Sequence, residues 1–359
     1  MCRRLLGIVL CVMPGPATLA RAGGPKDTNC AFRDAPYGKP CRPGHEQCCR
    51  GAPNSLCPMR TYTKPAAVFH LGNTQGCGEN DPNGPFFDPQ HGMYHQFFQD
   101  HLSLEGGGIS WGHWASRDFV KWTSLPVAIW PDMWYDGNAI FTGSATLDEH
   151  DNPVIVYPGM CGCPQARKGQ PKPPCDPRAQ QACHSGAAYS QAVPTNRSDP
   201  FLKNWTKPAY NPILNSTGDD PATAWKTPYG EWRFIGNGGR TMPLFAAKEL
   251  RGPWSVVGDI ANLTSGECPS LFPLPALTRG TSATPGEKLP THVYKRGRMG
   301  GPTKLQDHFQ IGDWVEGKPG EVAVWTPTPN IPYQARGGGV LVDEGLYYAS
   351  KDFCESTRH

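Results

Sequence analysis

The chain has 359 residues and a formal net charge of +3 at pH 7. A charge this small for the length gives no electrostatic basis for binding nucleic acid or an anionic membrane. The length suffices for one large domain with a sizeable core. The 42 glycines and 39 prolines, without a long 3.6-residue apolar pattern, predict few helices and many short strands joined by turns.

The first 22 residues have the pattern of a secretory signal peptide. Arg3 and Arg4 precede an apolar run over Leu5–Met13 that is too short to cross a bilayer, and Ala20 and Ala22 supply small residues near a cleavage point. An N-terminal membrane anchor, the alternative, does not fit that length. No later run reaches 18 uninterrupted apolar residues, so we expect an exported, extracellular protein that has no membrane partner and is a monomer.

The cysteines also favour an oxidising compartment. Of the 14 cysteines, all but Cys2 and Cys11 lie beyond the expected signal peptide, and half of the remainder stand at positions 23–77. Residues 23–62 therefore read as a Cys-rich N-terminal extension. A second cluster contains Cys161, Cys163, Cys175 and Cys183. Zinc is the alternative for that cluster, but the C-x-C spacing without a second close pair favours disulfides. The sequons at Asn196, Asn204, Asn215 and Asn262 fit a glycosylated surface.

From about residue 63 to residue 354, short apolar-aromatic runs alternate with turn residues. These blocks recur about every 50–60 residues, a spacing typical of a β-propeller with four short strands in each blade. The expected blocks are roughly 66–116, 118–190, 205–256, 268–314 and 320–354, with a short tail at 355–359. A β-sandwich or several small β domains remain alternatives on spacing alone.

Three acidic residues stand in turn-like segments. Asp81 precedes Pro82, Asp220 precedes Pro221, and Glu267 begins Glu-Cys-Pro. Each segment alone is typical of an ordinary turn or solvated loop. Their order and their surroundings carry more information than any one of them.

The succession of motifs resembles glycoside hydrolase family 32, which contains invertases, fructan hydrolases and fructosyltransferases. The resemblance covers about residues 64–354. It rests on Asn80-Asp81-Pro82-Asn83-Gly84, Phe97-Phe98-Gln99, Trp111-Gly112-His113, Ser116-Arg117-Asp118-Phe119-Val120-Lys121-Trp122, Phe141-Thr142-Gly143-Ser144-Ala145-Thr146, Asp219-Asp220-Pro221 and Glu267-Cys268-Pro269.

The resemblance implies a five-bladed propeller that acts on β-fructofuranosyl linkages in sucrose or fructans. Asp81 resembles the family's nucleophile, Glu267 its general acid/base and Asp220 its transition-state stabiliser. A retaining glycosidase needs two carboxylates, one to attack and one to protonate the leaving oxygen, and no metal or organic cofactor. The substrate-binding positions that we expect are Asn80, Gln99, Trp111, Phe141, Thr142 and Lys304.

The chain departs from the family pattern at several places. Gly78 and Gly106 stand where tryptophans are usual, and Asp219 replaces the Arg of Arg-Asp-Pro. Gly301-Pro302-Thr303-Lys304 matches Asp-Asp-Thr-Lys without its acidic residues, which favours a fructan-type hydrolase over a dedicated invertase. The family's usual C-terminal β-sandwich has no counterpart before residue 359. A non-catalytic carbohydrate-binding propeller and a fructosyltransferase on the same site are the alternatives.

Overall fold

The computed structural model describes residues 71, 78–101, 109–161, 176–182, 187–216, 218–274, 289–298, 305–329, 339–343 and 347–353. Regular structure in these ranges is almost all strand, with one short helix, α1 (Pro177–Ala182). The all-β class expected from the glycine, proline and turn content is confirmed.

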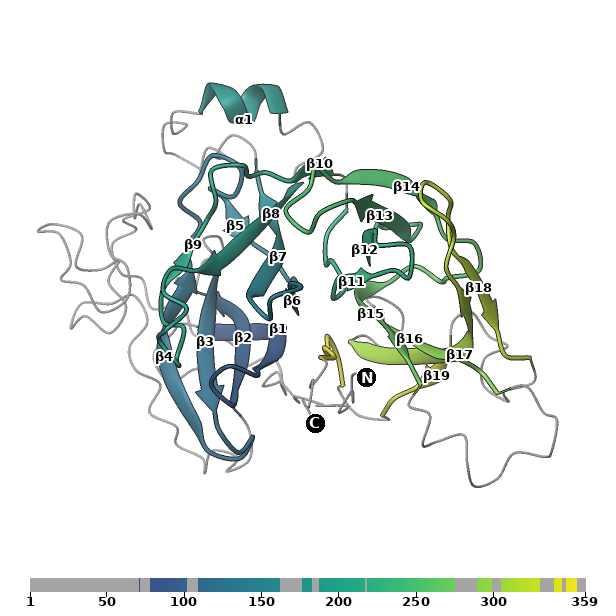
Figure 1. The fold of residues 1–359 in the computed structure, drawn as a ribbon, viewed down its shortest axis with the longest axis horizontal. Helices are drawn as coiled ribbons and strands as arrows, with labels where there is room; N and C mark the ends of the chain where they lie inside the picture. Colours follow the sequence, from purple (N-terminus) through teal and green to yellow (C-terminus); the bar gives the residue numbers. More distant parts are fainter. Residues whose placement is uncertain are drawn as a thin grey trace, which may run out of the picture.

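The strands form four antiparallel sheets, which we number as blades 1 to 4 in chain order (Figure 1). Blade 1 contains β1 (Gly78–Asp88), β2 (Met93–His101), β3 (Ser110–Ser116) and β4 (Trp122–Ile129). Blade 2 contains β5 (Ala139–Ile140), β6 (Ser144–Leu147), β7 (Pro153–Met160), β8 (Ala187–Pro194), β9 (Trp205–Thr206) and β10 (Leu214–Ser216).

Blade 3 contains β11 (Trp225–Lys226), β12 (Trp232–Ile235), β13 (Pro243–Ala247) and β14 (Ser255–Asp259). Blade 4 contains β15 (Glu267–Pro273), β16 (His292–Arg298), β17 (Gln306–Val315), β18 (Val324–Pro327) and β19 (Val340–Leu341). Blades 1 and 3 are simple meanders, in which each strand pairs with the next one along the chain.

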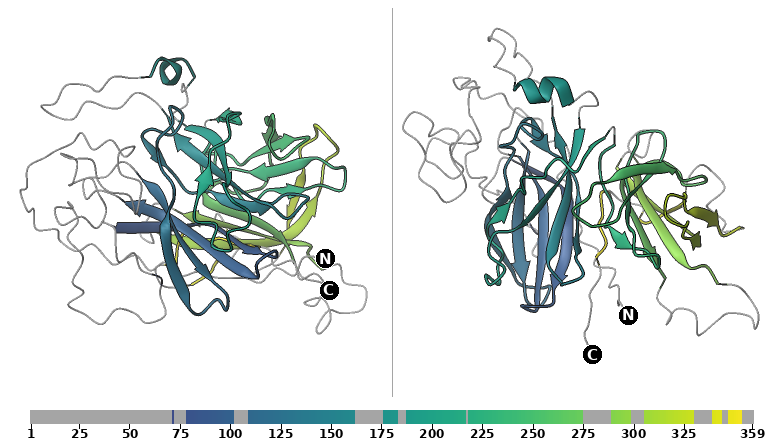
Figure 2. Two further views of the ribbon diagram at one scale, coloured as in Figure 1. Left: turned by 60° about the vertical axis from the view of Figure 1, so that its left-hand side comes forward. Right: turned by 45° about the horizontal axis from the view of Figure 1, so that its top comes forward.

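The blades stand side by side around a common middle, toward which β1, β6, β11 and β15 lie (Figures 1 and 2). Hydrogen bonds join neighbouring blades near this middle. The Gly84 N–H donates to the carbonyl of Gly143 at 3.1 Å, and the Ser144 hydroxyl donates to the carbonyl of Pro221 at 2.7 Å. This arrangement is a β-propeller, as the block spacing predicts.

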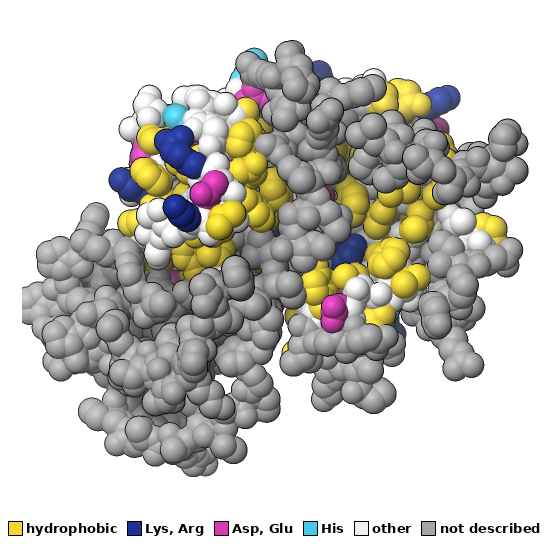
Figure 3. Space-filling view, turned by 90° about the horizontal axis from the view of Figure 1, so that it is seen from below, with side chains coloured by type: hydrophobic (Ala, Val, Ile, Leu, Met, Phe, Trp, Pro, Cys, Tyr) yellow, Lys and Arg dark blue, Asp and Glu magenta, His cyan; other side chains and the backbone are white. Residues whose placement is uncertain are grey.

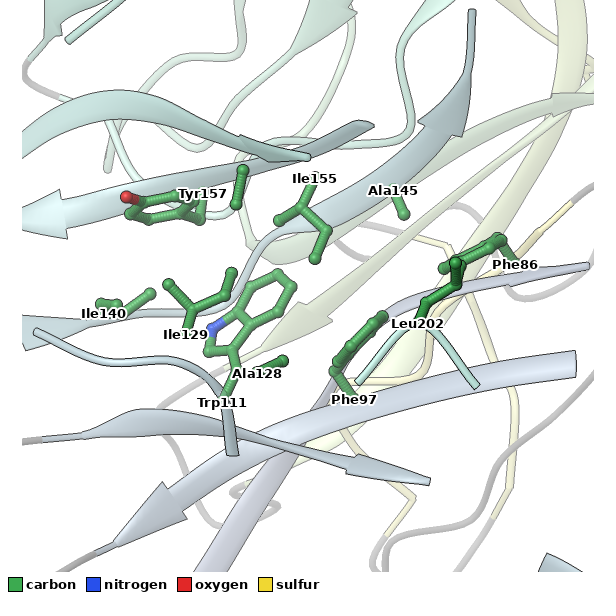
Figure 4. Close-up of a cluster of buried hydrophobic side chains, with 11 residues drawn as sticks. Phe86, Phe97, Trp111, Ala128, Ile129, Ile140, Ala145, Ile155, Tyr157 and Leu202 are labelled. Carbon is green, nitrogen blue, oxygen red and sulfur yellow. The ribbon is translucent and has the colours of Figure 1, made fainter. Parts of the chain in front are cut away.

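Apolar clusters fill the space between successive blades. Between blades 1 and 2, Phe97, Trp111, Ile129, Ile155 and Tyr157 are fully buried against one another (Figure 4). Separate clusters join blade 2 to blade 3 and blade 3 to blade 4. Burial of each blade face against its neighbour is the physical reason that the short strands are stable together.

The expectation of five blades is not confirmed. Within the predicted block 320–354, the described strands β18 and β19 both pair with β17 and so belong to blade 4. Residues 347–353 form no strand but run near the middle of the molecule, drawn in yellow between β1 and β15 (Figure 1). The expected signal peptide, the extension 23–62 and the tail 355–359 lie outside the described residues.

The described part of the chain has no helix long and apolar enough to cross a membrane. In the face shown in Figure 3, basic and acidic side chains are interspersed with hydrophobic ones. Cys161, in the second cysteine cluster, is disulfide-bonded, whereas Cys268 is free and fully buried. The even number of cysteines beyond the signal segment therefore does not mean that all of them pair.

Candidate active site

The first strand of blade 1 presents Asp81 at an irregularity in the sheet. The register between β1 and β2 shifts between Glu79 and Pro82, so Asn80 and Asp81 lie in a bulge. Pro82 has no N–H to donate to a ladder, and a bulge turns a side chain away from the regular alternation of a strand. The Asn-Asp-Pro sequence thereby frees the carboxylate of Asp81 from the sheet, and the side chain is half-buried.

Polar side chains from β1, β2 and the loop after β5 hold the Asp81 carboxylate. The Thr142 hydroxyl donates to Oδ2 of Asp81 at 2.7 Å, and Nδ2 of Asn80 donates to Oδ1 at 3.2 Å. Gln99 connects these two donors. Its Oε1 accepts from Asn80 at 2.8 Å and its Nε2 donates to Thr142 at 2.5 Å. The chain of bonds fixes the orientation of the carboxylate from two sides.

The first strand of blade 4 has a register shift like the one at Asp81 in blade 1. The register between β15 and β16 shifts between Glu267 and Ser270, which leaves Cys268 and Pro269 in the irregular stretch. Cys268 has a φ of 48°, in the left-handed region that a residue with a side chain seldom adopts. Such conformations persist where the surrounding structure enforces them, and they gather at functional sites.

Asp220 lies at the turn before β11 and also has a left-handed backbone, with a φ of 45°. Its Oδ2 accepts the backbone N–H of Cys268 at 2.9 Å. The preceding residue, Asp219, forms a backbone bridge with Asn237, which anchors the turn to the end of β12. A carboxylate of blade 3 is thus held by the backbone of blade 4.

The buried thiol of Cys268 links two of the predicted carboxylates. Its Sγ lies 3.5 Å from Oδ2 of Asp81 and 3.8 Å from Oδ2 of Asp220. Glu267 is the adjacent residue in the chain. The sulfur therefore joins carboxylates of blades 1 and 3, and the charge of Asp81 also raises the pKa of Glu267 in blade 4, so the three carboxylates named from the sequence lie near one another.

Glu267 has the electrostatic environment of a proton donor. Its side chain is half-buried, and the Tyr348 hydroxyl donates a hydrogen bond to Oε2. Burial, together with the negative charges of Asp81 and Asp219, raises the pKa of Glu267 to about 7. A carboxyl group with that pKa is protonated in a large fraction of molecules near neutral pH, as a general acid must be.

The two aspartates before Pro221 share a crowded, buried position. Burial raises the pKa of Asp220 well above its ordinary value, and the charge of Asp219 raises it further. Burial also raises the pKa of Asp219, while a hydrogen bond from Asn237 lowers it. The positive charge of Lys351 opposes the rise at both carboxyl groups. The Asp at position 219 therefore adds like-charge repulsion beside Asp220.

The predicted substrate-binding residues do not all reach the site. Asn80, Gln99 and Thr142 belong to the hydrogen-bond chain on Asp81, and Phe141 is half-buried beside it. Trp111 is a correction, because it is 0% exposed in the core between blades 1 and 2 and has no surface to offer a substrate (Figure 4). Its Nε1 instead donates to the Phe141 carbonyl at 3.1 Å. Lys304 lies outside the described residues.

Four residues without a role in the sequence-based prediction lie at the site: Cys268, Lys295, Tyr348 and Lys351. Cys268 lies inside the Glu-Cys-Pro motif, which was a usable signal. Tyr348 and Lys351 lie in Tyr-Ala-Ser-Lys, more than 80 positions after Glu267. The spacing of the strand blocks does not predict that these two residues lie near the middle of the molecule. Within the described ranges, no group of three or more His, Cys, Asp or Glu side chains is arranged to hold a metal ion.

Comparison with protein families gives a match to the glycosyl hydrolases family 32 N-terminal domain over residues 73–359. Among curated proteins, the chain is 32% identical over 295 residues to the vacuolar acid beta-fructofuranosidase 1 of a Rosa hybrid cultivar, covering 78% of this chain and 45% of that protein. It is 29% identical over 311 residues to the fructan 6-exohydrolase of Triticum aestivum, covering 78% and 47%. The chain thus spans about half the length of these relatives.

Among solved structures, fructan 1-exohydrolase IIa from Cichorium intybus matches with a TM-score of 0.56 and 26% identity, over 77% of this chain and 48% of that one. A variant of the same protein in complex with 1-kestose matches with a TM-score of 0.51 and 26% identity, over 70% of this chain and 44% of that one. The family match extends over most of the chain and includes every segment that supplies a carboxylate to the site. The chain therefore belongs to glycoside hydrolase family 32.

Proposed function

We propose that this chain is the catalytic part of an exported glycosidase that cleaves β-fructofuranosyl linkages in sucrose or fructans with retention of configuration. The observation that carries the proposal is the proximity of three carboxylates from three blades. Asp81 and Asp220 both contact the Sγ atom of Cys268, and the charge of Asp81 raises the pKa of the neighbouring Glu267. Grouped carboxylates of this kind bring like charges together in a partly buried place, which has no evident benefit for folding and is typical of a catalytic site.

In the proposed reaction, the Asp81 carboxylate attacks the anomeric carbon of the fructosyl unit. Glu267 gives its proton to the leaving oxygen, and the glycosidic bond breaks. In the second step Glu267 takes a proton from water, whose oxygen displaces Asp81 and releases fructose. The environment that raises the pKa of Glu267 to about 7 supports its role as the group that gives and regains the proton.

Asp220 is the proposed stabiliser of the positive charge that develops on the fructosyl ring. The transition state of glycoside cleavage resembles an oxocarbenium ion, so a fixed anion beside the ring lowers its energy. The hydrogen bond from the Cys268 N–H orients that anion before the substrate arrives. The carboxylate then needs no reorganisation during the reaction.

Fructans are the proposed preferred substrates. Two of the similar proteins are named as fructan exohydrolases, and a variant of one of them was solved with 1-kestose. In this chain Gly301 and Pro302 stand where the family pattern Asp-Asp-Thr-Lys has acidic residues. The proposal predicts a higher kcat/KM on inulin or levan than on sucrose.

The test measures reducing sugar released from sucrose, inulin and levan by the wild type, Asp81→Asn and Glu267→Gln. Both variants should lose release on every substrate, whereas Glu249→Gln, an exposed matched control, should keep it. No release by the folded wild type on any of the three would overturn the proposal. Sugar binding without turnover identifies a carbohydrate-binding propeller, and products longer than the substrate identify a fructosyltransferase.

The proposal for the whole protein also includes its organisation and its export. We propose that residues 1–22 direct secretion, that residues 23–62 are held by disulfides, and that residues 63–354 form a five-bladed propeller. Mass spectrometry of the secreted protein, with and without reduction, tests the cleavage point, the disulfides and the glycans at the sequons.

A further inference from the structure

Tyr348 lies in the segment 347–353 and is half-buried at the site. Its hydroxyl donates to Oε2 of Glu267, the proposed acid/base. A protonated carboxyl group accepts hydrogen bonds at its unprotonated oxygen, which is the stronger acceptor of the two. The contact therefore leaves Oε2 as the acceptor and Oε1 as the oxygen that carries the proton of Glu267.

The ring of Tyr348 occupies the place where Gly297 lacks a side chain. Gly297, in β16, pairs with Glu267 in β15. A Cβ on Gly297 would lie 2.8 Å from Cε2 of Tyr348, and 3.2 Å from both the carbonyl oxygen of Glu267 and Oδ1 of Asp307. The glycine thus leaves room for the tyrosine ring directly beside the strand pair that carries Glu267.

The backbone that follows Tyr348 is held by Asp307, a fully buried residue of β17. Oδ2 of Asp307 accepts the Ser350 N–H at 2.8 Å and the Ser350 hydroxyl at 2.5 Å, and its Oδ1 accepts the Ala349 N–H at 3.1 Å. Ala349 has a φ of 59°, in the left-handed region. A residue with a side chain keeps such a backbone only where its surroundings enforce it, and here the carboxylate of Asp307 does so.

The buried ammonium group of Lys295 joins this segment to the strand that carries Glu267. Its Nζ donates to the carbonyl of Cys268 at 2.7 Å, to the carbonyl of Ser350, and to Oδ2 of Asp307 at 3.5 Å. Cys268 directly follows Glu267 in the chain. One cation therefore contacts both the segment of the acid/base and the segment of the tyrosine.

Each element that adjoins the contact between Tyr348 and Glu267 contributes charged groups. They are Asp81 in β1, Asp219 in the turn before β11, Lys295 and Arg296 in β16, Asp307 in β17, and Lys351 in the segment 347–353. The negative charges of Asp81 and Asp219 act on Glu267 directly. None of these charges is removed by Tyr348→Phe, so that variant reports the effect of the hydroxyl.

We propose that Tyr348 is a positioning residue whose hydroxyl holds Oε2 of Glu267, so that Oε1 delivers the proton, and that the Lys295–Asp307 pair keeps the tyrosine in place. In the first step the proton on Oε1 passes to the leaving oxygen, the glycosidic bond breaks, and its electron pair stays with that oxygen. The carboxylate left behind keeps the hydrogen bond at Oε2, which is stronger to a charged acceptor than to a neutral one. The inference rests on the proposed function for its catalytic consequence, but the contact itself can be tested without turnover.

The first experiment measures kcat and KM against pH on sucrose and inulin for the wild type, Tyr348→Phe and Gly297→Ala. Without the donor, the ionised form of Glu267 loses more stabilisation than the protonated form, so its pKa rises. Tyr348→Phe should lower kcat about tenfold with a smaller change in KM, and should move the alkaline limb up by about one pH unit. Gly297→Ala, which displaces the ring but keeps the hydroxyl, should change both in the same direction. An alkaline limb at its wild-type position in both variants overturns the inference.

Asp307→Asn tests whether the buried ion pair acts through Tyr348. The single variant should move the alkaline limb in the same direction as Tyr348→Phe but by less. In the double variant the limb should lie where it does in Tyr348→Phe, because the hydroxyl that Asp307 positions is then absent, and a sum of the two shifts overturns the role of the pair. Tyr157→Phe is the matched control. It removes a 3.0 Å bond from a tyrosine hydroxyl to Asp136, outside the site, and should leave the limb unchanged.

The second experiment measures the melting temperature of Tyr348→Phe between about pH 5 and pH 9, in the wild-type and the Glu267→Gln backgrounds. Glu267 is protonated below its folded-state pKa of about 7 and ionised above it. Loss of the donor harms the ionised form more, so the deficit of Tyr348→Phe should be small at the acid end and grow as pH rises through 7. In the Glu267→Gln background the deficit should not vary with pH. Tyr157→Phe should cost the same in both backgrounds.

The two experiments separate failure of this inference from failure of the proposed function. A wild type that cleaves no fructoside removes the catalytic role, but the melting series still decides whether Tyr348 holds the Glu267 carboxyl group. A deficit for Tyr348→Phe that is equal at all pH values and unchanged by Glu267→Gln overturns the inference, because a ring that only packs would behave in this way.

Discussion

The backbone N–H of Cys268 donates to the carboxylate of Asp220 across 48 positions of sequence, and both residues have left-handed backbones. The bond joins the residue next to Glu267 to the proposed stabiliser. A shift of β15 would therefore move Glu267 and disturb Asp220 at the same time, because this contact couples blades 3 and 4 at the site.

Loss of the Thr142 hydroxyl should lower activity without unfolding the protein. Thr142→Val keeps the shape of the side chain but removes the 2.7 Å hydrogen bond to Asp81 and leaves Gln99 without its acceptor. A hydrogen bond to a charged group contributes about 1.5–3 kcal/mol, so kcat/KM should fall roughly tenfold to a hundredfold. Steady-state kinetics on the preferred fructan measures the change.

Thr146→Val is the matched control for that variant. Its hydroxyl also bridges two blades, with a 2.9 Å bond to the carbonyl of Ala224, but it makes no contact with the carboxylates. The control should change kcat/KM by no more than about twofold. Equal losses in the two variants would show that Thr142 contributes only to the joining of blades.

The pH dependence of kcat/KM should have an alkaline limb near pH 7. The first step needs Glu267 in its protonated form, and the raised pKa of about 7 means that this form is lost as pH rises through that value. A profile that stays flat from about pH 6 to pH 9 would contradict the assignment of Glu267 as the acid.

The same carboxyl group should make the folded protein less stable at high pH. Because the pKa of Glu267 rises from an ordinary 4.5 to about 7 on folding, the native state holds the proton more tightly than the unfolded state. Stability from this group is present below about pH 4.5 and is lost as pH rises through 7. Glu267→Gln cannot ionise and should melt higher than wild type at pH 8, with little difference at pH 4.5.

Differential scanning fluorimetry at the two pH values checks that expectation. Glu249→Gln, whose carboxylate is exposed in an ion pair with Arg251, should show no such divergence. Parallel melting curves for Glu267→Gln and wild type would mean that the active-site carboxyl group does not oppose folding.

Breaking the pair that anchors residues 347–353 should be costly. Asp307→Ala removes three hydrogen bonds to Ala349 and Ser350 and leaves Lys295 buried with its charge uncompensated. Removal of one partner from a buried ion pair typically destabilises by about 3–5 kcal/mol. Urea unfolding measures the loss. The double variant Lys295→Met with Asp307→Leu should recover part of it, and a double variant less stable than Asp307→Ala would contradict this account.

Gly143 should tolerate no side chain. A Cβ at this position would lie 2.3 Å from the carbonyl oxygen of Val156 and 2.9 Å from the Cα of Tyr157, both backbone atoms that cannot move aside. Gly143→Ala should lower the melting temperature by several degrees. Gly137→Ala, whose Cβ would meet one atom at 3.2 Å, should cost far less, and similar losses would show that the loop between β5 and β6 can move away from β7.

Much of the site follows from the sequence because its key residues stand in short motifs with local physical consequences. Asp-Pro and Glu-Cys-Pro place a carboxylate one or two residues before a proline, which cannot complete a strand ladder, and the register of the sheet shifts at each. The prediction of Trp111 as a binding residue was wrong because the sequence does not say which face of β3 is covered by blade 2.

The contributions of Lys295, Tyr348 and Lys351 were not predictable from the sequence. Tyr348 and Lys351 lie in a segment without strands that runs near the middle of the molecule, and Lys295, in β16, contacts that segment through the carbonyl of Ser350. The number of blades was also not fixed by spacing, since β18 and β19 pair with β17 although their block resembles a separate unit. The spacing of strand-like blocks does not show which strands pair with one another.

The order in which the site residues follow one another along the chain has a consequence for synthesis of the protein. Asp81 is made early and its counterpart Glu267 much later, while the lysine that reaches back to blade 2 is almost the last described residue. A ribosome-bound chain thus holds the carboxylates of the site without Tyr348 and Lys351 until residues 347–353 have been made. Shortened polypeptides that end before position 347 should therefore lack activity. The appearance of activity would then indicate that residues 347–353 have been made and lie in place.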